Sequence, residues 1–206
     1  MKAAIVVNGD VSDYDFTRRL LEACDYVVAC DGGLMHCHKM AVVPDCIVGD
    51  LDSVQCLELY PDIPVLRFPA EKDQSDLELA IEHVCDEGAA SLLILGGFGG
   101  RFDHQLANIH VLAQAANRGV KAELRDAHTR ICLINEYCRL HKTDGNIVSL
   151  LPLTTSADGI VTEGLKYPLT NESLFAGFAR GLSNLIINEY AEVSMKSGLL
   201  VVIQTR

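Results

Sequence analysis

Two aspartates separated by one residue, Asp50 and Asp52, follow the short apolar run 46–48. In an extended segment, residues i and i+2 point to the same side, so the two carboxylates converge on one point. Adjacent anions repel each other unless a cation or a proton lies between them. At the end of a buried strand this arrangement favours a hard divalent ion, and we expect Mg2+ held by oxygen ligands. The Asp-x-Asp pattern is weak by itself, so its meaning depends on which other residues reach it.

A glycine-rich segment, residues 96–101, follows an apolar run and precedes a predicted helix. Glycines such as Gly97, Gly99 and Gly100 let the backbone approach a bulky anion, and the helix N-terminus offers free N–H groups. Arg101 adds a planar guanidinium that suits phosphate. Neither the Walker pattern nor the dinucleotide fingerprint is satisfied. A tight structural turn between strand and helix therefore remains an alternative interpretation.

Other polar residues follow predicted strands or open predicted helices. Asp31 and Gly32 come after the apolar run 26–30, Asp76 opens a helix, and Asp103 opens another. Each has a structural explanation, because the helix dipole favours Asp76, Asp103 can be an N-cap, and Asp31 can begin a turn. Crowding four carboxylates at one sheet edge is nevertheless costly unless a metal ion relieves it. The predicted metal ligands are Asp31, Asp50, Asp52 and Asp76.

The segments that position these residues alternate between strands and helices. Continuous apolar runs predict buried parallel strands, and the capping-box pattern from Ser75 to Glu78 predicts a helix start. A further helix is expected from Asp103 to a stop at Gly119, with Leu106 on its inner face. This alternation is typical of an α/β domain with a mostly parallel sheet. The predicted strands are 3–7, 26–30, 46–48, 65–68, 91–95 and 120–124.

The pattern changes after about Asp126, where short apolar or alternating runs follow one another without helices between them. Turn residues, among them Asp158-Gly159 and Thr170-Asn171, are expected to separate these strands. Such a segment predicts a small antiparallel all-β sandwich or barrel. We therefore expect an α/β domain over residues 1–127 and a β-sandwich domain over residues 128–206.

Composition narrows the possible partners and location. The chain has 206 residues with 17 Lys and Arg against 28 Asp and Glu, a formal charge of −11, which disfavours nucleic acid as a partner. The apolar runs have the length of strands, so we expect no membrane insertion and no signal peptide. Eight cysteines without Cys-x-x-Cys spacing favour free thiols in a reducing cytoplasm. His36 and His38 flank Cys37, but no matched second cluster supports a zinc site.

The polar clusters, taken in order, resemble the motifs of the thiamine pyrophosphokinase family. The ordered set covers most of the chain and is specific to the family, although no single motif is specific by itself. The matching segments are 31–33, 49–53, 72–76, 96–104, 164–169 and 182–184. The family has an α/β catalytic domain followed by a β-sandwich, and this order agrees with the change of pattern near residue 126. The resemblance therefore implies a nucleotide- and metal-binding catalytic domain over residues 1–127 and a thiamine-binding sandwich over residues 128–206.

The resemblance implies transfer of the pyrophosphoryl group of ATP to the hydroxyl of thiamine, with release of AMP. Phosphoryl-type transfer depends mainly on positioning and charge neutralisation. The four predicted ligands would hold Mg2+ on the phosphates, and the glycine loop with Arg101, Asp31 and Gly32 would hold the nucleotide. Asp103 would position the thiamine hydroxyl or accept its proton. The implied catalytic residues are Asp52, Asp76, Arg101 and Asp103.

The resemblance also implies a homodimer whose thiamine pocket is completed by the partner's sandwich, with Ser183 and Asn184 on the thiamine side. Tyr167 stands where the family often has Trp, and Gly181-Leu182 precede Ser183 in place of a second hydroxyl residue. Three alternatives stay open: a diphosphokinase acting on a pterin alcohol, a nucleotide- or thiamine-binding protein without turnover, and a metal-dependent hydrolase. The sandwich favours thiamine over the pterin, and the glycine loop with Arg101 disfavours the hydrolase.

Overall fold

The computed structural model describes residues 1–51, 54, 56–69 and 71–206. The chain divides into two compact units, Met1–Ala127 and His128–Arg206. The first unit contains all the α-helices, and the second is built of strands and one short 3-10 helix. Among the described residues, no helix is both long enough and apolar enough to cross a membrane.

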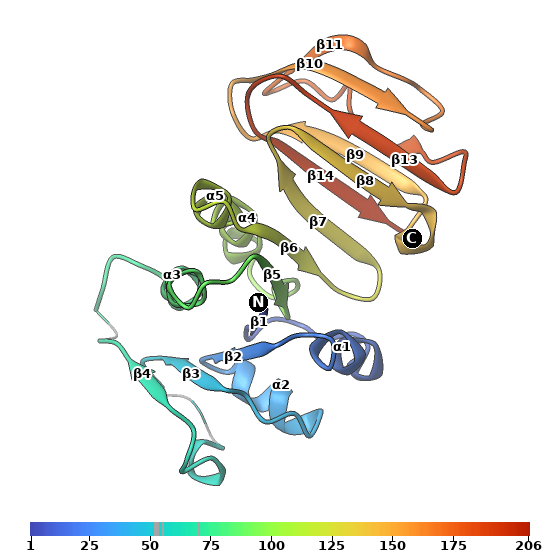
Figure 1. Cartoon of the computed structure of the whole chain (residues 1–206). Helices are drawn as coiled ribbons and strands as arrows, with labels where there is room; N and C mark the ends of the chain where they lie inside the picture. The colour runs from blue at the N-terminus through green and yellow to red at the C-terminus, as the bar shows by residue number, and fades with distance from the viewer. Residues whose placement is uncertain (52–53, 55, 70) are drawn as a thin grey trace. The chain divides into compact units, whose positions relative to one another are not determined.

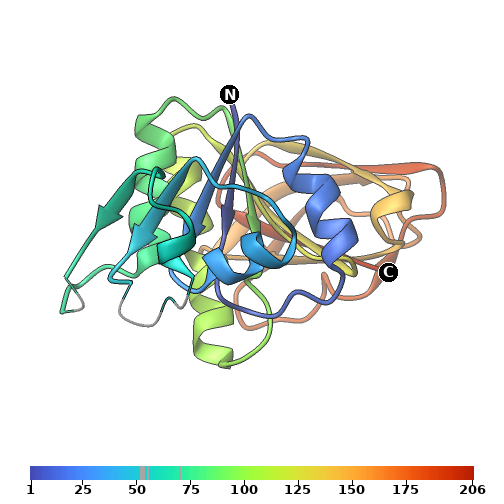
Figure 2. The same cartoon turned by 90° about the horizontal axis from the view of Figure 1, so that it is seen from below.

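The first unit is organised around a parallel sheet of six strands. The order across this sheet is β4-β3-β2-β1-β5-β6, and every neighbouring pair runs parallel. Figure 2 shows β4 at the outer edge. In each of the strands β1, β2 and β5, four of the five residues are buried, as expected for strands covered on both faces. The strands are β1 (Lys2–Val6), β2 (Tyr26–Cys30), β3 (Cys46–Gly49), β4 (Val65–Arg67), β5 (Ser91–Leu95) and β6 (Lys121–Arg125).

Helices cover both faces of this sheet. Figure 1 shows α1 and α2 on one face and α3 and α5 on the other, and α4, which has no buried residue, packs against α5. The predicted capping box is confirmed, because the Glu78 N–H donates to the Ser75 hydroxyl and the Ser75 N–H donates to the Glu78 carboxylate. The helices are α1 (Tyr14–Leu21), α2 (Gly33–Lys39), α3 (Asp76–Asp86), α4 (Phe102–His110), α5 (Leu112–Asn117) and the 3-10 turn η1 (Leu57–Leu59).

The expected continuous helix from Asp103 to Gly119 is wrong, because the chain turns at Val111 and forms α4 and α5 in its place. Val111 ends α4, and its N–H donates to the carbonyl of Ala107. The turn changes which side chains face the sheet: Leu112 is fully buried in α5, whereas Leu106 in α4 is 47% exposed. Because α4 contains no buried residue, the prediction that Leu106 faces the core is wrong.

The second unit is a sandwich of two antiparallel sheets with the orders β12-β9-β14-β7 and β11-β10-β13-β8. One apolar core, in which Leu140, Ile160 and Leu200 are fully buried, lies between them. The α/β unit followed by this all-β sandwich confirms the predicted fold class. The strands are β7 (Thr129–Ile134), β8 (Tyr137–His141), β9 (Ile147–Pro152), β10 (Ser156–Glu163), β11 (Thr170–Phe175), β12 (Asn184–Leu185), β13 (Tyr190–Ser194) and β14 (Leu200–Thr205), with the 3-10 turn η2 (Lys142–Asp144).

Two predicted turns of the sandwich are wrong. Asp158 and Gly159 lie inside β10, where the register with β11 shifts and Gly159 has a φ of +68°. This geometry is a β-bulge, in which glycine serves as a bend within a strand rather than as its end. Thr170 and Asn171 begin β11, although Asn171 keeps a φ of +54°. The strands β8 and β11 carry many polar side chains, so their apolar signal was too weak to predict them.

Candidate active site

Four connections leave the carboxyl ends of neighbouring parallel strands in the first unit. Residues 8–10 follow β1, residues 31–32 follow β2, residues 50–51 follow β3, and residues 96–101 follow β5. Because these strands are parallel, the connections meet at one edge of the sheet. Open α/β sheets bind their ligands at that edge, which is therefore the candidate active site.

Three carboxylates gather at this edge. Asp31 follows β2, Asp50 follows β3, and Asp76 is the first residue of α3. Burial raises the pKa of Asp31 above its ordinary value of 3.8, and the negative charges of Asp76 and Asp50 raise it further. Like charges held this close disfavour one another, so a cation placed among them lowers the energy of the group.

Lys72 supplies positive charge to the cluster. Its Nζ lies 2.9 Å from Oδ1 of Asp76, and the two side chains are 15% and 22% exposed. Burial opposes the charge on Lys72, but the Asp76 carboxylate outweighs this effect and raises the lysine pKa above 10.5, with smaller contributions from Asp50 and Asp31. Among the described residues coupled to Lys72 here, one ammonium group faces three carboxylates, so this group carries net negative charge, which suits a divalent cation.

The backbone is strained at Asp31 and in the segment after β3. The φ angles of Asp31 and Leu51 are +51° and +61°, a region that a bulky residue such as leucine rarely adopts. Gly49 has a φ of +149°, and a Cβ atom there would overlap Oδ1 of Asp31. The Leu51 N–H points toward the same oxygen at 3.4 Å. Such strain persists only where surrounding structure enforces it, and it concentrates at functional sites.

The donor set of the cluster suits Mg2+, which prefers carboxylate oxygens and keeps several waters. The net negative charge and the raised pKa of Asp31 point the same way. Asp52, the fourth predicted ligand, and Ser53 lie outside the described residues. Within residues 1–51, 54, 56–69 and 71–206, no three His, Cys, Asp or Glu side chains form a ready metal-binding group. The metal assignment therefore stays a prediction that rests on charge and ligand chemistry.

The glycine-rich loop is fixed on both sides. Gly97 packs so closely on Leu124 that a Cβ atom would overlap the leucine side chain, and its carbonyl accepts a hydrogen bond from the Asn108 amide at 2.9 Å. Gly99 and Gly100 have φ angles of +81° and +65°. Glycine adopts this left-handed conformation without strain, so the backbone forms a compact loop before α4. A loop of this kind at the start of a helix can approach an anion through its N–H groups.

Arg101 and Asp103 form an ion pair with each other at the start of α4. The Arg101 Nε and Nη2 lie 3.1 and 2.5 Å from the two Asp103 oxygens. Their side chains are 74% and 63% exposed. The guanidinium lowers the pKa of the Asp103 carboxyl, so Asp103 stays ionised. Both predicted residues are thus brought together in an open position where a ligand can reach them.

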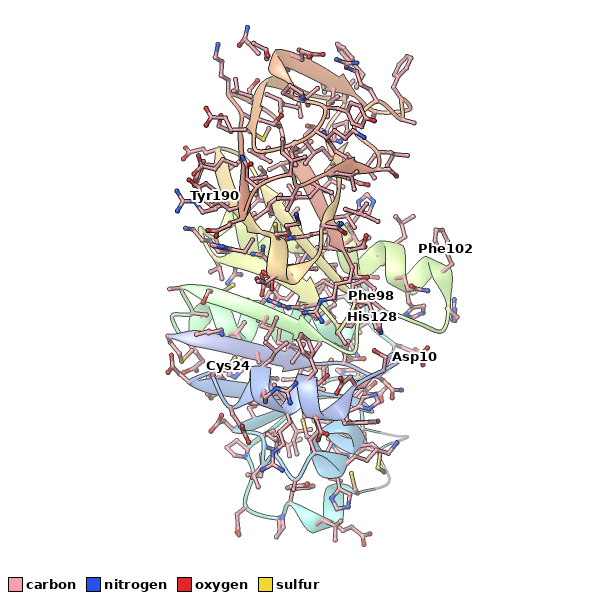
Figure 3. All side chains as sticks on the ribbon, turned by 90° about the vertical axis from the view of Figure 1, so that its right-hand side faces the viewer. Asp10, Cys24, Phe98, Phe102, His128 and Tyr190 are labelled. Carbon is pink, nitrogen blue, oxygen red and sulfur yellow. The ribbon has the colours of Figure 1, made fainter. Side chains whose placement is uncertain are left out.

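The connection Asn8-Gly9-Asp10 also belongs to this edge, although its residues were not among the site residues predicted from the sequence. Asp10 forms an isolated bridge with Phe98 of the glycine-rich loop, and Figure 3 shows both residues. A Cβ atom on Gly32 would overlap the Asn8 side chain, so Asn8 packs directly on the predicted Asp31-Gly32 motif. The signal was available, because Asn8 follows the central strand β1 and the strand-end rule applies to it as to the others.

In the second unit, Ser183 and Asn184 lie in different environments. Asn184 is 8% exposed, and its Oδ1 accepts hydrogen bonds from the backbone N–H groups of Tyr167 and Leu185 at 3.0 and 2.9 Å. Its Nδ2 donates to the Tyr167 carbonyl at 2.7 Å. Asn184 therefore clamps the segment of Tyr167, whose side chain is 60% exposed. Ser183 is exposed and has a φ of +55°.

Comparison with known families agrees with this division of the chain. The sequence model described as "Thiamin pyrophosphokinase, catalytic domain" matches residues 17–124. The model described as "Thiamin pyrophosphokinase, vitamin B1 binding domain" matches residues 134–200. The chain belongs to the thiamine pyrophosphokinase family. The first match contains most of the strand-end residues described above, and the second contains Tyr167, Ser183 and Asn184.

Individual family members are similar over most of their length. The thiamine pyrophosphokinase of Bacillus subtilis (strain 168) is 28% identical over 184 residues, 86% of this chain and 86% of that protein. Thiamine pyrophosphokinase 1 of Oryza sativa subsp. japonica is 27% identical over 192 residues, 82% of this chain and 69% of that protein. The crystal structure of thiamin pyrophosphokinase from Geobacillus thermodenitrificans superposes with a TM-score of 0.86 at 26% identity, covering 100% of this chain and 98% of that one.

Proposed function

We propose that this thiamine pyrophosphokinase family member transfers the pyrophosphoryl group of ATP to thiamine, giving thiamine diphosphate and AMP. The observation that carries this proposal is the pairing, at one sheet edge, of a net-negative carboxylate cluster with a glycine loop and an exposed arginine. Such a pairing suits a metal-bound polyphosphate, because the metal offsets the carboxylates while backbone N–H groups and Arg101 receive the phosphates.

On the nucleotide side, Asp31, Asp50, Asp52 and Asp76 would hold Mg2+. When bound, the ion supplies positive charge that neutralises the phosphate oxygens during transfer. Lys72 holds Asp76 in place at the first turn of α3. The loop containing Gly97, Gly99 and Gly100, together with Gly32, lets the phosphates come close to the backbone.

On the acceptor side, the Asp103 carboxylate accepts a hydrogen bond from the hydroxyl of thiamine. Its pKa is lowered by Arg101, so it orients the hydroxyl better than it stores the proton. The hydroxyl oxygen forms a bond to the β-phosphorus of ATP, the bond from that phosphorus to the oxygen bridging the α-phosphate breaks, and AMP leaves with that oxygen. The hydroxyl proton passes to Asp103 or to solvent.

The second unit is the proposed thiamine-binding domain, with the exposed Ser183 and the segment that Asn184 clamps facing the substrate. We further propose a homodimer in which each thiamine pocket receives these residues from the partner subunit. Sedimentation at several protein concentrations tests the dimer. The eight cysteines are free thiols, five of them buried, and we place the enzyme in a reducing cytoplasm on that basis.

The deciding experiment incubates the purified protein with thiamine and ATP, with and without Mg2+, and separates the products by chromatography. We expect thiamine diphosphate and AMP in equal amounts and only with the divalent ion. ADP in place of AMP, or no turnover of thiamine, contradicts the proposal. A pterin alcohol offered as a competing acceptor tests the alternative diphosphokinase activity, which the match to the vitamin B1 binding domain makes the weaker candidate.

A further inference from the structure

The glycine-rich loop after β5 is hydrogen-bonded along its backbone to the connection after β1. The Val7 N–H donates to the Leu95 carbonyl at 2.9 Å, the Gly9 N–H to Gly96 at 2.6 Å, and the Asp10 N–H to Phe98 at 2.7 Å. A Cβ atom on Gly9 would overlap the carbonyl oxygens of both Gly96 and Phe98. The two connections therefore form one tightly packed unit, and displacement of Gly9 must displace the loop.

His36 forms a hydrogen bond with the carbonyl group of Gly9. Its Nε2 lies 2.8 Å from the Gly9 carbonyl oxygen, and its Nδ1 lies 2.8 Å from the Tyr14 hydroxyl. A carbonyl oxygen only accepts, so we assign the proton to Nε2, and Nδ1 then accepts from the tyrosine. Burial lowers the pKa of His36, which favours this neutral form. A chain of hydrogen bonds thus runs from α1 through α2 to Gly9 and on to the glycine loop.

The two residues that follow His36 in α2 make contacts separate from those of His36. Cys37 is fully buried in the core on another side of α2. His38 is exposed, and its Nδ1 lies 3.2 Å from the Tyr60 hydroxyl. The three side chains therefore do not converge on one point.

We propose that His36 is a positioning residue for the nucleotide, acting through the Gly9 carbonyl to set the place of the Gly96–Gly100 loop. The proposal rests on the function proposed above, which places the phosphates on this loop. The helix itself has other anchors, because Leu34 and Cys37 are fully buried and Met40 is 3% exposed. Loss of the His36 hydrogen bond therefore frees Gly9 and the loop without detaching α2.

The test measures binding of adenosine 5′-(α,β-methylene)triphosphate with Mg2+ by titration calorimetry, since this analogue cannot release AMP. His36→Met fills a similar volume without a donor, and we expect it to raise Kd about fivefold, the ratio that matches one net hydrogen bond. His36→Gln restores an N–H donor and should bind within about twofold of wild type. His38→Ala is the matched control on the same helix, and it should leave Kd unchanged.

Hydrogen exchange gives a second measurement that does not depend on turnover. In His36→Met we expect faster exchange of amides in residues 9–10 and 96–100, with α2 still protected. An unchanged Kd in His36→Met, an equal loss in His38→Ala, failure of His36→Gln to restore binding, or a wild type that does not bind the analogue overturns the proposal. A wild type that binds the analogue but does not convert thiamine refutes the proposed reaction and leaves this role of His36 intact.

Discussion

The carboxylate of Asp103 accepts two hydrogen bonds from the guanidinium of Arg101, at 3.1 Å from Nε and 2.5 Å from Nη2. The two residues are therefore coupled before any ligand arrives. A phosphate that approaches Arg101 competes with Asp103, and a hydroxyl that approaches Asp103 competes with Arg101. Because the pair is open to solvent, a ligand can replace either partner at little cost.

Asp103→Asn separates these two roles. We expect kcat to fall about a hundredfold, because the amide cannot hold the acceptor hydroxyl as the carboxylate does. Affinity for the methylene analogue of ATP should stay the same or improve, since Arg101 loses its competitor. The control is Asp86→Asn, which removes another exposed carboxylate, paired with Arg118 at 2.7 Å. A weaker nucleotide affinity in Asp103→Asn would show that Asp103 serves the donor rather than the acceptor.

Asp31→Asn tests the charge crowding at the proposed metal site. The raised pKa of Asp31 means that its charge destabilises the metal-free fold, increasingly so as the pH rises above 3.8 and through the folded pKa. Asparagine tolerates the φ of +51°, so metal-free Tm near pH 7 should rise by about 2 °C. Mg2+ should then stabilise the variant less than wild type, whereas the exposed control Asp62→Asn should change neither value. A lower metal-free Tm would contradict the crowding.

Gly49→Ala tests how closely the strand end must approach Asp31. An added Cβ would overlap the Asp31 carboxylate, and the φ of +149° disfavours alanine as well. The control Gly88→Ala has an unfavourable φ of +82° but open space around it, so it should cost only about 1 kcal/mol of unfolding free energy with activity kept. We expect Gly49→Ala to cost more and to abolish activity. Equal unfolding free energies for the two variants would mean that Asp31 moves aside freely.

The parallel sheet was largely predictable from the sequence, because its strands are buried on both faces and stand out as apolar runs. The predicted limits of the strands at residues 26–30 and 91–95 are those of β2 and β5. The sandwich was less predictable, since Gly159 forms a bulge inside a strand and looks in the sequence like the end of one. Local patterns do not distinguish these two uses of glycine.

The candidate site likewise contains residues that the sequence pattern predicts and residues that it does not. Asp31 and Asp50 directly follow parallel strands and Asp76 opens the helix after β4, so the order of elements along the sequence already predicts that these residues share one edge of the sheet. His36 could not be found that way, since its role depends on a contact between α2 and a connection 27 residues earlier. Such a contact arises from tertiary packing and leaves no periodic signal in the sequence.

Asp52→Asn tests the residue that lies outside the described part of the chain. If Asp52 holds the metal, turnover should fall below about one per cent of wild type, because charge neutralisation of the phosphates is lost. Thermal unfolding without metal should show a folded protein. Glu58→Gln, an exposed acid in η1, is the control and should keep full activity. Activity near wild type in Asp52→Asn would remove this residue from the metal site.

Asn184→Ala tests whether Asn184 acts on thiamine through Tyr167. The substitution removes three hydrogen bonds of a buried side chain, so unfolding should require about 2–4 kcal/mol less. KM for thiamine should rise while KM for ATP stays unchanged, because the clamped segment belongs to the second unit. Asn188→Ala, an exposed asparagine nearby in the sequence, should change neither stability nor KM. Weaker thiamine binding with unchanged stability would instead place Asn184 in direct contact with the substrate, which these hydrogen bonds argue against.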